Sequence, residues 1–226
     1  MSDTAYDELG VYAAMRTLRA VRRLRPDPVP GPVLERVLEA ASWAPTGGNV
    51  QPWRVIAVRD RALVAQLGKL YAARWHAYSK QHMAQLEGAP EALRAKTERM
   101  LGAGNYLADH FADVPVVLVF CFNPKLMAIT DAKQGRISVV GGASIYPAVE
   151  NALLACRAEG LGCVLTTLLC EVEPDVRALL SIPEPWATAA AVQIGYPVGK
   201  GHGPITRRPV AKLVFADRWD APWGGA

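Results

Sequence analysis

The feature that most constrains the fold is the apolar run at 116–122, Val-Val-Leu-Val-Phe-Cys-Phe. β-Branched and aromatic residues favour strands, and a run that is apolar at every position is typical of a strand buried on both faces. The unbroken apolar stretch that contains it, 114–122, is about half as long as a membrane-spanning helix needs. We therefore expect a covered sheet and no membrane span. Further strands are predicted at 54–58, at 188–194 and at 163–169, where the strand runs into a loop at Thr166 and Thr167.

Helix patterns alternate with these strands. Apolar side chains recur at helical spacing over 33–41 and again over 143–159, where Gly160 provides the C-terminal stop. A Pro-rich turn at 27–32 is predicted to end a first helix and to start the next.

The segment at about 69–105 is rich in Arg, Lys, Glu, Gln and Ala at helical spacing, with a break near Gly88-Ala89-Pro90. We predict a two-helix excursion that leaves the sheet. Tyr71, Trp75 and Tyr78 lie along one side of its first helix. We interpret them as a stripe that packs on a neighbouring helix rather than as a platform for a substrate.

Length and composition favour one globular domain that spans 1–226. The chain has 226 residues, of which 51% are hydrophobic and 20% are charged, and it is long enough to bury a core without metal or disulfide. No repeat or linker divides it. The first residues are acidic, unlike a secretory signal, so we expect a cytoplasmic protein.

The cysteines and histidines do not suggest a metal site. Cys121, Cys156, Cys163 and Cys170 lack Cys-x-x-Cys spacing, and three of them fall in segments that are otherwise apolar. We expect reduced thiols within the core. The four histidines form no His-Glu-x-x-His motif and pair with no cysteine at metal spacing.

Five arginines lie within ten residues that contain no acid: Arg16, Arg19, Arg22, Arg23 and Arg25. Guanidinium groups offer forked donors to phosphate oxygens, so a single phosphate is one candidate ligand. A solvated basic helix face explains the cluster equally well. Nucleic acid is disfavoured, because the cluster has no interleaved aromatic residues and the chain has no nucleic-acid-binding module.

The segment 44–53, Ala-Pro-Thr-Gly-Gly-Asn-Val-Gln-Pro-Trp, lies between a helix pattern and a strand pattern. Its prolines fix the backbone, and its two glycines let a ligand approach the main chain. Asn49 and Gln51 add amide groups. The composition suits either a cradle for a flat ligand or an ordinary helix-to-strand loop.

The chain contains little catalytic chemistry of its own. We find no nucleophile motif, no Gly-x-x-x-x-Gly-Lys loop and no Gly-x-Gly-x-x-Gly after a strand. Such a sequence is expected when a bound cofactor carries the reaction.

Five motifs, in this order along the chain, resemble the FMN-dependent nitroreductases: Arg19-Ala20-Val21-Arg22-Arg23 with Pro26-Asp27-Pro28-Val29-Pro30, then Ala44 to Trp53, then Glu159-Gly160-Leu161-Gly162 with Thr166-Thr167-Leu168, then Ile194-Gly195-Tyr196-Pro197, and last Arg207-Arg208-Pro209. The resemblance implies an α+β fold with a central, mostly antiparallel sheet flanked by helices. It also implies a homodimer that binds FMN at the subunit interface.

The resemblance assigns site residues by position. It places the FMN phosphate and ribityl chain at the arginines near both ends of the chain, and it does not choose between Arg22 and Arg23 or between Arg207 and Arg208. Many members begin the first motif with two arginines and a serine, where this chain has Leu18-Arg19-Ala20. The cofactor-binding residues that we predict are Arg19, Ala20, Arg22, Arg23, Pro45, Thr46, Gly47, Asn49, Gln51, Thr166, Thr167, Leu168, Arg207 and Arg208, with the 45–51 loop coming from the partner subunit and Thr166 to Leu168 lying near flavin N5.

The reaction that the resemblance implies is ping-pong hydride transfer from NADH or NADPH through FMN to an electron-poor acceptor, such as a nitroaromatic or quinone. The same fold used for reductive dehalogenation or flavin breakdown is an alternative, and so is a flavin-binding sensor or storage protein without turnover. We expect the segment 69–105 and the loop near Gln134 and Arg136 to set the choice of acceptor.

Overall fold

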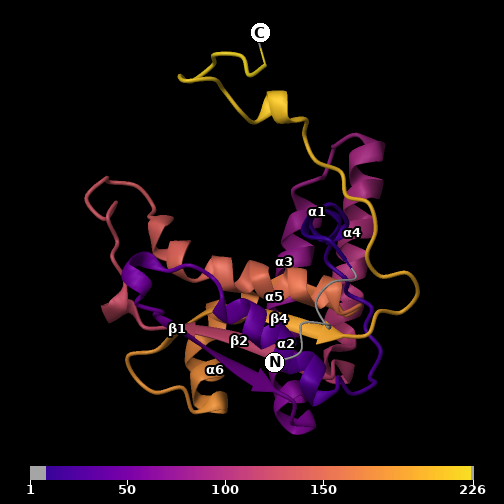
Figure 1. Cartoon of the computed structure of the whole chain (residues 1–226). Coiled ribbons are helices and arrows are strands. Elements are labelled where there is room, and N and C mark those ends of the chain that lie inside the picture. The colour runs from indigo at the N-terminus through magenta and orange to yellow at the C-terminus, as the bar shows by residue number, and fades with distance from the viewer. Residues whose placement is uncertain (1–8, 225–226) are drawn as a thin grey trace.

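The computed structural model describes residues 9–224 and is built around a four-stranded sheet (Figure 1). The strands are β1 (Trp53–Val58), β2 (Val116–Phe122), β3 (Gly162–Thr166) and β4 (Ala187–Gly195), in the order β1-β2-β4-β3. Every neighbouring pair is antiparallel. The antiparallel α+β architecture implied by the family resemblance is therefore confirmed.

Strand β2 explains why its sequence is apolar at every position. Val117 and Val119 belong to one buried cluster, and Leu118 and Phe120 belong to another. Successive side chains of a strand point to opposite faces, so both faces of β2 lie in a core. The predicted limits of this strand are those observed.

The first face is covered by α2 (Gly31–Ser42) and α5 (Tyr146–Ala158). The two helices are antiparallel, since Asn151 Nδ2 donates to the Ala40 carbonyl (3.0 Å) and Arg36 pairs with Glu159 (2.8 Å, Nε to Oε1). Helix α5 begins three residues later than predicted, after a 3₁₀ turn, and Gly160 follows it at φ 71°.

The second face is covered by α3 (Arg61–Ala84) and α6 (Glu173–Leu180), with α4 (Glu91–Asp109) against α3. The expected excursion at 69–105 is therefore wrong in one respect, because α3 starts earlier and its first half packs on the sheet through Val64 and Leu67. Trp75 donates from Nε1 to Asn105 Oδ1 (2.8 Å) and fills the space over Gly104, where an added Cβ would lie 1.8 Å from the indole ring. Tyr71 and Trp75 are buried, as the stripe interpretation predicts, but Tyr78 is exposed.

The predicted limit of the first helix is also wrong. Helix α1 (Val11–Thr17) ends ten residues before the turn at Asp27, and the residues in between are not helical. Their backbone donors bond to distant carbonyls, from Val21 to Cys163 (2.9 Å) and from Arg25 to Tyr196 (2.8 Å). Arg16 lies on α1, whereas the other four arginines of the cluster lie outside any helix.

Residues 197–203 are still hydrogen-bonded to the body of the molecule, and the chain beyond them leaves it (Figure 1, yellow). Six large apolar side chains between residues 197 and 224 are exposed: Val198, Val210, Leu213, Val214, Trp219 and Trp223. Between residues 9 and 224, no helix combines the length and the apolar character that a membrane crossing requires. Short 3₁₀ helices complete the structure at Gly47–Asn49, Phe111–Asp113, Pro124–Leu126, Val140–Ser144, Leu168–Val172 and Val210–Lys212.

Candidate functional site

The arginine segment, which we define as residues 18–25, lies beside the first residues of β3 and the end of β4. Besides the two backbone bonds given above, Val198 N–H donates to the Arg23 carbonyl (2.9 Å). Arg19 and Arg23 are exposed and Arg22 is half-buried. The backbone is fixed while the cationic ends of the side chains remain at the surface.

The three arginines diverge. Arg19 donates from Nε to the Gly201 carbonyl (2.8 Å). The Arg23 guanidinium carbon lies 4.1 Å from the centre of the Tyr106 ring on α4. Burial raises the pKa of Tyr71 on α3 to about 12, and the nearby positive charge of Arg22 opposes that rise. Arg22 and Arg23 therefore lie toward α3 and α4, and Arg19 lies toward residues 201–203.

His202 holds Arg19 in place, and sequence reasoning missed this residue. Its Nδ1 lies 3.4 Å from the Arg19 backbone N–H and must accept that hydrogen. The proton is then on Nε2, which donates to the Leu161 carbonyl (2.8 Å). Burial, followed by the charges of Arg157 and Arg19, lowers the pKa of His202, so the neutral ring is favoured. A lone histidine between two glycines gave no signal of this role.

The residues Thr166 to Leu168 lie at the other end of β3 from the arginine segment. Leu168 N–H donates to Thr166 Oγ1 (3.2 Å), and Thr167 is exposed. From Cys163 to Thr167 a strand spans about 13 Å. Because β3 is an edge strand, a single elongated ligand could lie along its edge and meet both groups.

The conformation of the 45–51 loop is held by hydrogen bonds within the loop and by one hydrogen bond to Ser144. Gly47 N–H donates to Ser144 Oγ (3.1 Å), and Gln51 bonds to Thr46 Oγ1 (3.1 Å, from its N–H) and to Asn49 Oδ1 (3.1 Å, from Nε2). Gly48, Asn49 and Gln51 have positive φ values of 58°, 54° and 50°. The loop presents a fixed, exposed turn.

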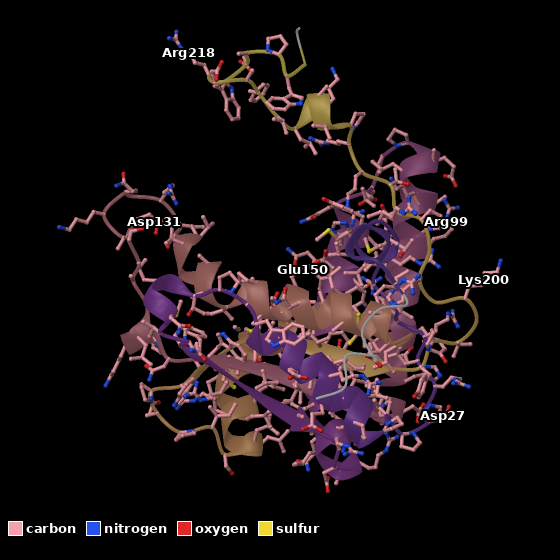
Figure 2. All side chains as sticks on the ribbon, in the orientation of Figure 1. Asp27, Arg99, Asp131, Glu150, Lys200 and Arg218 are labelled. Atoms are coloured by element: carbon pink, nitrogen blue, oxygen red, sulfur yellow. The ribbon has the colours of Figure 1, made fainter. Side chains whose placement is uncertain are left out.

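Within one chain, however, this loop is far from the arginine segment. The loop contacts Ser144, just before α5, whereas Arg157 near the end of α5 donates from Nε to Thr17 Oγ1 (3.0 Å), next to the arginine segment. Helix α5 has 13 residues and is about 20 Å long. Figure 2 shows the helix that carries Glu150 between the loop that carries Asp131 and the helix that carries Arg99.

The C-terminal arginines are likewise not joined to this group in one chain. Arg207 and Arg208 are exposed, and Arg207 Nη1 donates to the carbonyl of its neighbour Thr206 (3.0 Å). They lie on the segment that leaves the body of the molecule. The predicted residues thus fall into three groups: the edge of β3, the 45–51 loop and the C-terminal segment.

A cavity of about 440 Å³ adjoins Thr167. It lies at the end of the sheet where β2 finishes and β4 begins, beside the first residues of α5 and beneath the segment 124–142. Arg136, in the loop that we expect to influence acceptor choice, pairs with Asp131 (Nη1 to Oδ2, 2.7 Å) within the same segment.

The profile of the Nitroreductase family matches residues 15–196 of the chain. A protein of Thermus thermophilus named NADH dehydrogenase is 30% identical over 198 residues, which cover 87% of this chain and 91% of the relative. A 5,6-dimethylbenzimidazole synthase of Rhodobacter capsulatus is 30% identical over 219 residues, 91% of this chain and 92% of that protein. Among solved structures, the NADPH:FMN oxidoreductase from Vibrio harveyi complexed with NAD+ has a TM-score of 0.66 at 18% identity, covering 93% of this chain and 77% of that one.

Proposed function

Because the chain belongs to the nitroreductase family, we propose that it is an FMN-dependent oxidoreductase that takes a hydride from NADH or NADPH and passes it to an electron-poor acceptor such as a quinone or nitroaromatic. The observation that carries this proposal is the edge of β3, with arginines at one end and Thr166 to Leu168 at the other. The names of the similar Thermus and Vibrio proteins support the reaction type.

The residues present fit an elongated anionic cofactor. Arg19 has its Nε engaged by Gly201, which fixes the side chain and leaves the two Nη groups on its exposed end to donate to a phosphate. Arg22 would place positive charge beside the flavin, which favours a reduced, anionic ring. FMN, when bound, supplies the hydride transfer, and the protein supplies binding and orientation.

We further propose that the complete site needs two copies of the chain. The 45–51 loop and the arginine segment lie at opposite ends of α5, so both can contact one flavin when the loop comes from a partner subunit. The apolar side chains exposed on 197–224 also require cover. The C-terminal arginines would then reach the site as part of the assembled homodimer.

A second candidate reaction, flavin breakdown, is favoured by the likeness to 5,6-dimethylbenzimidazole synthase over nearly the whole chain. Reductive dehalogenation has weaker support, from a 24% identical iodotyrosine deiodinase of Danio rerio. A storage or sensor protein would bind flavin without turnover. These alternatives predict different fates of bound flavin and different acceptors.

The test is NAD(P)H oxidation by the FMN-loaded protein with a quinone and with a nitroaromatic. We expect acceptor-dependent turnover with parallel lines in steady-state plots, since donor and acceptor would occupy the site in turn. Intersecting lines would contradict the ping-pong order. No turnover despite bound FMN would refute the proposed reaction, and loss of flavin absorbance with formation of a fragment would favour breakdown.

The phosphate ligands are tested by dialysis. Arg19→Ala removes a charge-assisted hydrogen bond worth about 1.5–3 kcal/mol, so FMN affinity should fall about ten- to a hundredfold. Arg207→Ala should do the same if its side chain reaches the site in the dimer. Arg99→Ala, an exposed arginine on α4, is the matched control. Flavin retention by both site variants equal to that of the control would exclude these two arginines.

A further inference from the structure

We infer that the cavity beside Thr167 is the acceptor pocket and that it selects a neutral, flat aromatic ring over any acceptor that carries a carboxylate, phosphate or ammonium group. This inference deepens the proposed function and rests on it, because Thr167 belongs to the segment placed at the flavin edge. It follows from the position, the charge and the shape of the cavity.

The position suits a second ligand beside a flavin. The volume of about 440 Å³ lies within the usual range for small-molecule sites, roughly 300–1,000 Å³. Thr167 forms part of its wall, so the cavity and the edge of β3 share one residue. The cavity is walled by strand ends, the start of α5 and the segment above: Phe122, Pro124, Met127, Ile129, Ile145 and Ala189.

The uncharged lining of the cavity is the strongest argument for this selectivity. No residue that lines the cavity carries a charge. Moreover, four of its polar groups already donate their hydrogens within the protein: Ser138 to Asp131 (2.6 Å), Tyr146 to Ala189 (3.2 Å), Cys170 to Thr188 (3.6 Å) and Thr188 to Glu173 (2.8 Å). An ionised group that entered would lose hydration without gaining a charged partner from the lining residues, which is unfavourable.

The groups behind the wall reinforce the selection against anions. The two charged residues that accept those hydrogen bonds, Asp131 and Glu173, are both acidic. Asp131 is paired with Arg136, whose side chain is 54% exposed. An anionic acceptor therefore meets carboxylates close to the cavity wall, so anions are disfavoured more than neutral rings.

The shape of the cavity depends on Gly142. A Cβ there would lie 2.6 Å from the Tyr146 ring, so the glycine allows one edge of that ring to approach the backbone beside the cavity. Its φ is not in the left-handed region. Gly142→Ala is therefore compatible with the backbone and should push Tyr146 into the cavity. Met127, half-buried in the segment above, is the place to add a charge without disturbing the core.

The first experiment measures binding without turnover. Isothermal titration of the holoprotein with 2-naphthol, which is neutral at pH 7.5, and with 2-naphthoate, which is anionic, compares two rings of similar size. We expect naphthol to bind at least tenfold more tightly. Gly142→Ala should weaken naphthol binding. Met127→Lys should reduce the ratio of naphthol affinity to naphthoate affinity. Gly102→Ala on the surface of α4 is the control and should change neither affinity.

Equal affinities for the two rings, no binding of either, or unchanged naphthol binding in Gly142→Ala would overturn the inference. Turnover provides an independent readout: Gly142→Ala should raise the KM for a neutral quinone, whereas Gly102→Ala should leave it as in the parent. Absence of all turnover together with intact naphthol selectivity would refute the proposed reaction and leave the neutral pocket in place.

Discussion

Replacing Gly104 with Ala tests the contact that joins α3 and α4. A Cβ at this position would lie 1.8 Å from Trp75 Cζ2, so the indole must move. Overpacking costs about 1–3 kcal/mol, and loss of the Trp75–Asn105 hydrogen bond about 1 kcal/mol more. The better helix propensity of Ala offsets about 1 kcal/mol of this destabilisation. The net loss is about 1–3 kcal/mol, or roughly 2–12 °C in Tm for a chain of this size.

Gly102→Ala is the matched control, because it lies on the same helix and a Cβ there meets nothing within 4 Å. It should stabilise the protein by up to about 1 kcal/mol. Urea unfolding of both variants at one protein concentration measures the difference. The reasoning fails if Gly104→Ala is as stable as Gly102→Ala. It also fails if the cost persists in a Trp75→Leu background, where the clashing ring is absent.

Three further outcomes are expected. Because folding lowers the pKa of His202, the unfolded chain takes up a proton on this side chain at a higher pH than the folded chain does. The free energy of unfolding should therefore fall as the pH drops below about 6.5. A His202→Asn variant whose free energy of unfolding depends equally steeply on pH would contradict this. Asp60 accepts a hydrogen bond from Leu63 N–H (2.9 Å) at the start of α3, so Asp60→Ala should cost about 1 kcal/mol in urea unfolding and Asp60→Asn much less. If the 45–51 loop completes the partner's site, dilution that dissociates the dimer should release FMN in step, as followed by light scattering and flavin fluorescence; a monomer that retains FMN would count against the shared site.

Strands and the α2 pattern could be predicted because their signals are local. The apolar run at 116–122 gave β2 at its observed limits, and the predicted strand at 54–58 differs from β1 by one residue. The sheet order could not be read from periodicity and came from the family resemblance. It is set by the pairing of residues far apart in the chain.

The errors and omissions arise from long-range contacts. The arginine segment was expected within or beside a helix, yet its donors bond to Cys163 and Tyr196, about 140 and 170 residues away in the sequence. The helical excursion was placed away from the sheet because its predicted start at residue 69 left out Val64 and Leu67, which belong to the same buried cluster as Val117 and Val119 of β2. The separation between the 45–51 loop and the arginines follows from the antiparallel packing of α2 on α5, which no local pattern encodes.

The arginine segment also affects the solubility of the folded chain. Strand β3 is at the edge of the sheet, and an uncovered edge offers its free N–H and C=O groups to strands of other molecules. The hydrogen bond from Val21 to Cys163 covers the start of this edge, and the flanking cationic side chains repel a second copy that approaches in the same way. The same residues that suit a phosphate ligand therefore also protect the protein from edge-to-edge aggregation.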